Sequence, residues 1–488
     1  MNRRELLKTF GAAGVAGAAT RLSAPPVAIR ATPVRRRDYA GDELQTRLEA
    51  AIAKHKVPGA SIALYKDGKL ETAAAGVVNV STGVPMTTDT VMHIGSITKT
   101  LNATLLMQLV DEGRVALDQP LKQYLPDFRV ADPAATERIT VKMLLNHTSG
   151  INGEITREAG HDHERIVDGV GRIAKMDQLH EPGNDLSYCN PGTVLAGYLA
   201  QRLTDKSWYD LMKERLFAPL EMKHAVVVPE DALLYRASVG HFLNPADGTC
   251  TRTTFAFLPL SYAPAGATAM LSATDLVTFA RAHLNDGVGP NGKRILSGGG
   301  AAAMRTKTAS YQGAGFTEFG LGWQLMPNGS LTHGGGGPGI LSSLYLHPAS
   351  QTAIAVLTNA AHGNAVTAEF VRPLVEGWGG RVASDVTADL VKNAADGPVD
   401  PARYLGTYEG YFSALRVIPQ GNGIALTSRS KFKIYDSTSL AETAPVQLRP
   451  ITDRQFAYGS SVVTFINPDR TGKMGHIAMS GRLVKRTA

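Results

Sequence analysis

Residues 95–113 read GSITKTLNATLLMQLVDEG, and this stretch predicts a long helix that begins near Ser96 and ends at Gly113. Its apolar face is spaced at helical intervals by Ile97, Leu101, Leu105, Leu109 and Val110. Ser96 and Lys99 are three positions apart, so their side chains share one helix face, about 5–6 Å from each other. A serine at a helix N-terminus lies among free backbone N–H groups, and a buried lysine can lose its proton and act as a base. The stretch predicts a nucleophile and its base, although Ser-x-x-Lys alone equally fits an N-cap serine with a surface lysine.

Strand-like runs on both sides of this helix indicate an α/β fold. A helix is predicted over residues 40–56, and a hairpin turning at Asp67-Gly68 follows it. Residues 114–260 have the pattern of helices and loops. The predicted strands are Ala60–Lys66, Leu70–Val80, Gly320–Leu325, Ser342–Leu346 and Ala353–Asn359. A sheet drawn from both ends of a segment, with a helical block inserted between them, is an α/β arrangement.

Two further motifs carry candidate chemistry. Tyr188-Cys189-Asn190 offers a phenol that can relay a proton and an amide that can fix a substrate carbonyl, but alone it fits a core tyrosine in a turn. Residues 333–339 read HGGGGPG ahead of a strand, and such glycines let a substrate lie close and expose an N–H for an oxyanion. Alone, this motif fits a flexible glycine loop. Cys189 is expected to be a buried, inert thiol.

The order and spacing of the three motifs resemble those of the penicillin-recognising serine hydrolases. This superfamily includes class C β-lactamases, DD-peptidases, and related esterases and D-aminopeptidases. Other segments that agree are Pro120–Pro126, Leu144–Ile151, Pro264–Gly266, Leu271–Leu276 and Gly320–Trp323. The resemblance covers about residues 40–380. It implies an antiparallel sheet flanked by helices, with a helical subdomain, as in the β-lactamase/transpeptidase-like fold.

The resemblance also implies an acyl-enzyme mechanism. Ser96 would be the nucleophile, and Lys99 and Tyr188 would share the acid and base work, with either of the two as the base. Substrate positioning would come from Asn190, His333 and Gly335, and the oxyanion would be held by the backbone N–H groups of Ser96 and Gly336. No metal and no cofactor is expected.

His333 departs from the pattern of true β-lactamases and DD-peptidases. Those members usually carry Lys-Thr/Ser-Gly at the third motif, and the lysine charge helps to hold a substrate carboxylate. A histidine with its ordinary pKa near 6.5 is mostly neutral at pH 7. The departure favours neutral esters or amides, or peptides recognised through their amino end. An esterase or D-aminopeptidase/amidase is therefore predicted, with a β-lactamase or DD-carboxypeptidase as the alternative.

The C-terminal part has a different character. Residues 381–401 are rich in Ala, Asp, Gly and Pro and are predicted to be a linker, so the hydrolase domain is expected at 39–380. Short strand-like runs separated by turns predict a small all-β barrel domain at 402–488, which resembles the lipocalin-like appendage of some family members. The runs are Leu415–Ile418, Ile424–Thr427, Phe432–Tyr435, Val446–Leu448, Gln455–Tyr458, Val462–Ile466 and His476–Met479.

The basic excess of the chain belongs to its first residues. The chain has 50 basic and 43 acidic side chains, of which residues 1–37 hold eight and one, so the remainder is balanced. No nucleic-acid partner is therefore expected.

Arg3-Arg4 followed by an apolar, Ala-rich stretch resembles a bacterial twin-arginine signal, and residues 1–38 are predicted to be an export signal and linker. A periplasmic or secreted location follows. No run of about 18 apolar residues occurs, so no integral membrane domain is expected.

Two other function classes remain open at this stage. An acyltransferase would use the same acyl-enzyme and pass it to an amine or alcohol instead of water. A non-catalytic binding module would have no use for Ser96, Lys99 and Tyr188 together. The expected partner is a small-molecule or peptide substrate, and the oligomeric state is not indicated by the sequence.

Overall fold

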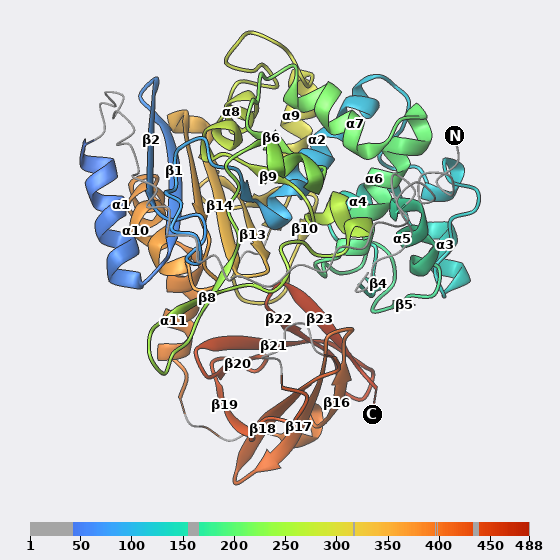
Figure 1. Cartoon of the computed structure of the whole chain (residues 1–488). Helices are drawn as coiled ribbons and strands as arrows, with labels where there is room; N and C mark the ends of the chain where they lie inside the picture. Colours follow the sequence, from blue (N-terminus) through green and yellow to red (C-terminus); the bar gives the residue numbers. More distant parts are fainter. Residues whose placement is uncertain are drawn as a thin grey trace, which may run out of the picture. The chain divides into compact units, whose positions relative to one another are not determined.

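The computed structural model describes residues 42–154, 165–315, 318–395, 397, 399–432 and 439–487. The predicted export signal at residues 1–38 lies outside these ranges. Within them, no helix is both long enough and apolar enough to cross a membrane. Residues Ala40–Ala488 form one compact unit, in which a sheet with its helices (here the αβ region, residues 42–380) is followed by a β-barrel (Figure 1).

The αβ region is built on an eight-stranded sheet in the order β10-β11-β12-β13-β14-β15-β1-β2. All of its strand pairs are antiparallel, as the resemblance implied. Its strands are β1 (Gly59–Lys66), β2 (Lys69–Gly76), β10 (Ala309–Ser310), β11 (Glu318–Phe319), β12 (Gln324–Leu325), β13 (Leu331–Gly337), β14 (Ile340–His347) and β15 (Thr352–Thr358). β1 pairs with β15, which joins the two ends of the αβ region into one sheet. The predicted α/β class is confirmed.

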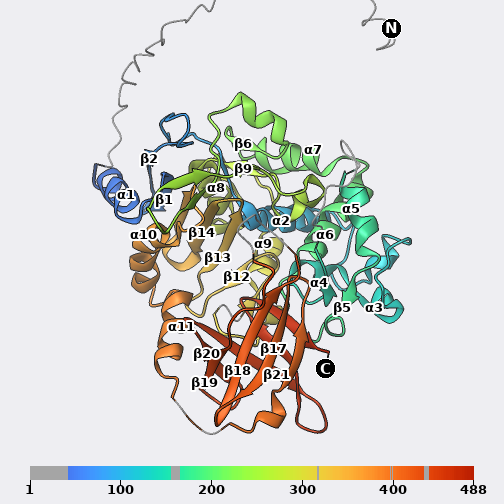
Figure 2. The same cartoon turned by 60° about the horizontal axis from the view of Figure 1, so that its bottom comes forward.

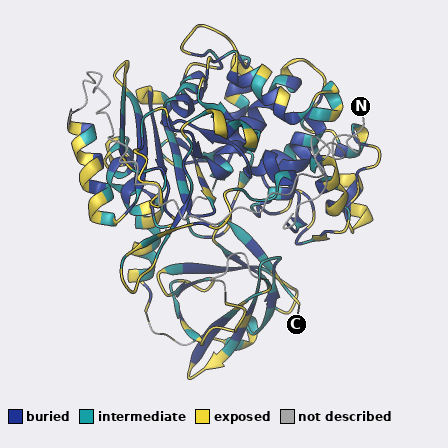
Figure 3. Cartoon of the chain, in the orientation of Figure 1, coloured by how far each residue is buried: buried dark blue, intermediate teal, exposed yellow. Residues whose placement is uncertain are grey.

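Helices cover both faces of this sheet because its central strands are apolar on both sides. Ile354 and Val356 of β15 pack with the helices α1 (Asp42–His55) and α10 (Asn364–Gly377). Ala355 and Leu357 point to the opposite face, toward α8 (Ala273–Leu284). The outer side of α1 is exposed, whereas the central strands β1 and β15 are mostly buried (Figure 3).

A helical block lies beside the sheet and contains the predicted helix, α2 (Thr98–Asp111). All but three of the residues of α2 are buried, because α6 and several other helices surround it. The other helices of the αβ region are α3 (Pro133–Arg138), α4 (Val141–Leu145), α5 (Arg165–Ile173), α6 (Asn190–Thr204), α7 (Trp208–Met212) and α9 (Gly298–Arg305). Small sheets contain β3 (Met92–His93), β4 (Ile151–Asn152), β5 (Asp177–Gln178), β6 (Ala225–Val226), β7 (His241–Leu243), β8 (Cys250–Arg252) and β9 (Met270–Leu271).

The C-terminal strands close into an eight-stranded barrel, which confirms the predicted barrel (Figure 2). Its strands are β16 (Gly406–Glu409), β17 (Ser413–Gln420), β18 (Gly423–Ser430), β19 (Val446–Pro450), β20 (Gln455–Tyr458), β21 (Ser461–Pro468), β22 (Met474–Met479) and β23 (Arg482–Arg486). Pairing of β16 with β23 closes the barrel. Inward side chains, including Tyr408, Phe456 and Phe465, fill its interior.

Two local predictions differ from the structure. The segment Gly320–Leu325 is predicted as one strand, but only Gln324–Leu325 is a strand (β12), and residues 320–323 form the turn from β11 to β12, with Gly322 at φ +80° close to Ala103 of α2. The predicted linker contains the helix α11 (Ala383–Lys392), which packs against β20 and β21 of the barrel. Arg372 pairs with Asp385 at 2.7 Å, and so ties α11 to the αβ region. The predicted strand at residues 432–435 lies mostly outside the described residues.

Candidate active site

Ser96 lies where the short helix η1 (Gly95–Ile97) leads into α2. It lines a cavity of about 500 Å³ together with Tyr188, His333 and Arg482. The N-terminal end of α2 lies directly behind it, so the free N–H groups and the helix dipole favour negative charge near the Ser96 hydroxyl. The position predicted for the nucleophile is therefore open to a small molecule.

Lys99 is buried directly beside Ser96. Its Nζ lies 2.9 Å from Ser96 Oγ and 2.6 Å from the carbonyl oxygen of Ala265, in the short helix η6 (Leu260–Ala265). Burial lowers the pKa of Lys99 from its ordinary 10.5 to about 7. The nearby Glu154 carboxylate raises this pKa and Arg482 lowers it, both by less than burial does. Near neutral pH a large fraction of Lys99 is thus neutral and able to accept a proton.

Tyr188 is the second candidate base beside Ser96. Its ring centre is 4.9 Å from Lys99 Nζ. Burial raises the pKa of Tyr188 above its ordinary range, and a hydrogen bond with the Ser96 hydroxyl lowers it by less. The phenol therefore keeps its proton at neutral pH. The backbone N–H of Tyr188 donates to the carbonyl of Gly481 at 2.9 Å, so the barrel holds this residue directly.

The glycine motif is strand β13, not a flexible loop. Gly337 and Ile340 flank a two-residue turn and pair across the β13–β14 hairpin. Gly336 is one position further from this turn, where the N–H of an antiparallel strand points away from its partner strand. A Cβ added to Gly95 would lie 2.7 Å from the Gly336 nitrogen, so this N–H is next to the residue that precedes Ser96. The arrangement fits the predicted pair of oxyanion donors.

The close approach of β13 to Ser96 depends on Gly335. A Cβ at this position would lie 1.9 Å from the carbonyl oxygen of Ile94 and 3.2 Å from the backbone nitrogen of Ser96. Any other residue would force the strand away from η1. Gly335 therefore acts by letting two backbones meet, in addition to any contact with a substrate.

His333 is neutral and presents an acceptor. Burial lowers its pKa to about 3, and the Lys99 charge acts in the same direction. Its Nδ1 is 2.6 Å from the Gly334 carbonyl oxygen, which only accepts hydrogen bonds, so Nδ1 carries the proton. Nε2 then has a lone pair, and this atom is buried without a hydrogen-bond partner among the described residues, in a side chain that lines the cavity. A substrate N–H, O–H or ammonium suits this atom, whereas a carboxylate does not.

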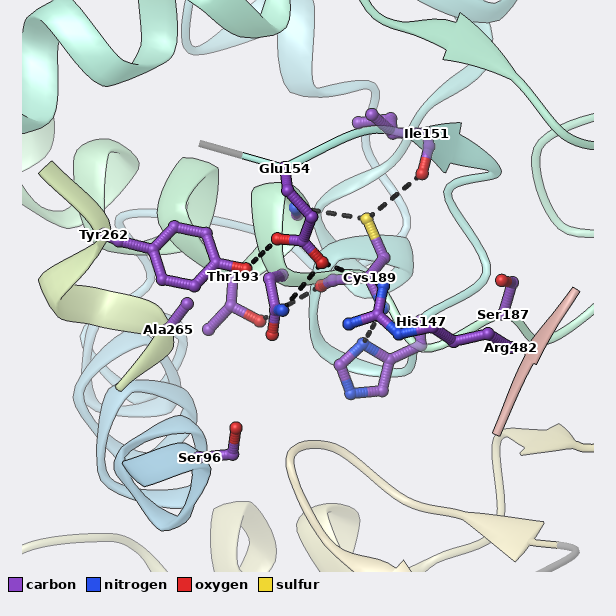
Figure 4. Close-up of polar contacts among 12 residues, drawn as sticks. Ser96, His147, Ile151, Glu154, Ser187, Cys189, Thr193, Tyr262, Ala265 and Arg482 are labelled. Carbon is purple, nitrogen blue, oxygen red and sulfur yellow. Dashed lines mark hydrogen bonds and ion pairs between the residues drawn. The ribbon is translucent and has the colours of Figure 1, made fainter. Parts of the chain in front are cut away.

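Asn190 does not point freely at the cavity but joins a buried cluster around Glu154. Its Nδ2 donates to Glu154 at 2.9 Å, while its Oδ1 is buried without a hydrogen-bond partner among the described residues. Tyr262 donates to the same carboxylate, and Arg482 pairs with it at 2.8 Å. In Figure 4, Tyr262 and Arg482 lie around Glu154, above Ser96.

Sequence reasoning missed Glu154, Tyr262 and Arg482. Tyr262 comes two residues before the Pro264–Gly266 segment, and Glu154 follows shortly after the Leu144–Ile151 segment, so both positions adjoined recognised motifs. Arg482 had no such signal, because it lies in a basic strand of the barrel far along the chain.

Cys189 is structural, as expected. Its sulfur accepts from the Gly192 N–H at 3.3 Å at the start of α6, and burial raises its pKa. Cys189 and Cys250 are both free thiols. Among the described residues, no cluster of three His, Cys, Asp or Glu side chains could hold a metal ion.

The chain is similar to known proteins both in sequence and in structure. The family described as Beta-lactamase matches residues 44–372. "Penicillin-binding protein 4" of Amycolatopsis lactamdurans is 36% identical over 374 residues, which is 75% of this chain and 96% of that protein. Two solved structures are also similar. SurE, also solved with D-Leu, has a TM-score of 0.73 at 26% identity and covers 91% of this chain and 99% of its own. The D-amino acid amidase of Ochrobactrum anthropi SV3 has a TM-score of 0.53 at 31% identity. The match covers 65% of this chain and 90% of the amidase chain.

Proposed function

The chain belongs to the beta-lactamase family, and from this premise we propose that it is a serine hydrolase that cleaves esters or amides through an acyl-enzyme on Ser96. The observation that carries the proposal is the 2.9 Å contact between Lys99 Nζ and Ser96 Oγ at the edge of the cavity. A lysine with its pKa near 7 accepts the serine proton without further activation.

The geometry supports a division of labour between the two candidate bases. Lys99, partly neutral near pH 7, takes the proton as Ser96 Oγ attacks the substrate carbonyl. The N–H groups of Ser96 and Gly336 stabilise the oxyanion. Tyr188 keeps its phenolic proton, so it donates to the leaving group and is reprotonated through Lys99. Water then releases the acyl group, with the same residues acting in reverse.

The substrate class we propose is a D-amino-acid amide or ester. The unprotonated Nε2 of His333 favours a substrate with an N–H or ammonium group near β13 and disfavours the carboxylate of a penicillin. The similarity to a D-amino acid amidase, and to SurE, which was solved with D-Leu, supports the D configuration. Export by the segment at 1–38 remains part of the proposal.

Intact mass and product release should separate the candidate substrates. We expect D-alanyl p-nitroanilide and a short-chain p-nitrophenyl ester to be turned over, and the L-alanyl anilide to react at least about tenfold more slowly. A penicillin should give little adduct. Ser96→Ala is the control and should abolish every adduct and all turnover. A fast penicilloyl adduct, or equal rates for the D and L anilides, would contradict the substrate class.

The pH dependence of acylation should report Lys99. We expect the rate to rise about tenfold per pH unit below pH 7 and to level off above about pH 8, as Lys99 loses its proton. The neighbouring histidines do not explain such a limb, because burial holds the pKa of His333 near 3, of His93 near 4 and of His147 well below its ordinary value. Stopped-flow rates with the p-nitrophenyl ester would measure it. A rate that stays flat from pH 6 to 9 would exclude Lys99 as the base.

A further inference from the structure

The turn between β22 and β23 carries part of the barrel into the active site. Ser480 and Gly481 form this turn with positive φ values, and both line the same cavity as Ser96. The turn is fixed on both sides. The Gly481 carbonyl accepts from the Tyr188 N–H at 2.9 Å, and the Leu483 N–H donates to Ser187 Oγ at 3.1 Å. Arg482 lies between these two anchors, so its position relative to Tyr188 is set by backbone contacts.

Arg482 pairs with Glu154, the carboxylate at the centre of the buried cluster. Its Nη1 is 2.8 Å from Glu154 Oε1, and the Glu154 side chain is only 4% exposed. The guanidinium carbon is also 5.3 Å from the centre of the Tyr188 ring. A buried carboxylate needs a counter-charge, and the αβ region supplies only the neutral donors Asn190 and Tyr262 among the contacts that the structure records. The barrel provides the cation.

Among the described residues, Glu154 and Arg482 are the charged groups that act on Lys99. Burial raises the pKa values of Tyr188, Cys189 and Tyr262, so these three are neutral. His147 and His333 are neutral because burial lowers theirs. Of the remaining two, Glu154 raises the pKa of Lys99 and Arg482 lowers it. The two charges oppose each other at the candidate base.

We propose that Arg482 is a positioning residue of the active site, delivered by the barrel to neutralise Glu154 and so to balance the charge around Lys99. The inference rests on the proposed function of Ser96 and Lys99. The proposal gives the barrel a defined task. Without Arg482, the buried Glu154 carboxylate would act alone and would hold a proton on Lys99. The barrel is thus part of the catalytic unit, and not only a support or a wall of the cleft.

Opposite single substitutions test this balance. The measured quantity is the pH profile of the rate at which Ser96 is labelled. We expect Arg482→Met to move the acidic limb of this profile up by about one pH unit, since Glu154 then acts unopposed. Glu154→Gln keeps an oxygen acceptor for Asn190 and Tyr262 but leaves Arg482 unopposed, so it should move the limb down by a similar amount. The double variant should return close to the wild type. Labelling by a fluorophosphonate probe, followed by intact mass from pH 5 to 9, gives the limb for each protein.

A purely structural role would give a different result. If Arg482 only anchors the barrel, both single variants lose rate at every pH with the limb unmoved, and the inference is overturned. Arg482→Lys should keep the limb near its wild-type position because it keeps the charge. If Arg482→Met does not fold, Glu154→Gln alone decides, and an unmoved limb there overturns the inference. Failure of the wild-type protein to label at Ser96 would instead refute the proposed function.

Discussion

Replacing Lys99 by methionine is expected to abolish catalysis while making the folded protein more stable. Among the described residues, Lys99 is the only basic side chain that a hydrogen bond joins to the Ser96 hydroxyl, and it is buried and partly neutral near pH 7. Its loss should lower kcat/KM by about 10³- to 10⁴-fold. Methionine has a similar length without a charge to bury, so the melting temperature should rise.

The gain in stability should depend on pH in a definite direction. The pKa of Lys99 is about 7 in the folded protein and 10.5 in an ordinary environment. Between these values the unfolded chain binds more protons than the folded one, so this lysine makes stability rise with pH. Its cost is largest below pH 7, and Lys99→Met should therefore stabilise more at about pH 6 than at about pH 9. Calorimetry at the two pH values measures this.

Lys66→Met is a suitable control, since Lys66 is exposed at the β1–β2 hairpin. It should leave both activity and stability near the wild type. Unchanged activity in Lys99→Met would remove Lys99 from the mechanism. A lower melting temperature at both pH values would mean that its contacts with Ser96 and Ala265 outweigh the cost of burial.

Gly335→Ala should damage the site although it replaces no polar side chain. The added methyl would overlap the Ile94 carbonyl at 1.9 Å, so β13 must move away from η1 and carry the Gly336 N–H with it. A displacement of the Gly336 N–H by about 1 Å is expected to lower kcat/KM by about 10²-fold. The overlap should also destabilise the protein by about 1–3 kcal/mol.

Gly334→Ala is the matched comparison for stability. It lies next to Gly335 in the same strand, but a Cβ there would have its nearest neighbour 3.9 Å away. Its unfolding free energy should stay within about 0.5 kcal/mol of the wild type. Chemical denaturation of the two variants measures the difference, and equal stabilities would show that β13 absorbs the Gly335 methyl without moving.

Local patterns explain which parts of the fold could be predicted. The helix at 95–113 has one clear apolar period, and six runs of the barrel alternate enough to be read as strands. β16, with the sequence GTYE, has too few apolar residues, and β23, with the sequence RLVKR, is too basic to be recognised alone. The apolar residues of Gly320–Leu325 predict a single strand, whereas the turn at residues 320–323 depends on the contact of Gly322 with α2, which no local pattern shows.

The sequence by itself was enough to identify Ser96, Lys99, Tyr188 and His333 as candidate site residues. Each belongs to a short local motif: one helix turn, one tripeptide or one strand. The sequence also determined that a barrel follows. Only the tertiary structure decided how charged the site is. Burial in the folded protein lowers the pKa of Lys99. The ion pair between Glu154 and Arg482 joins two segments that are more than 300 residues apart in the sequence. Desolvation and ion pairing depend on what surrounds a group in space, and no local pattern records that.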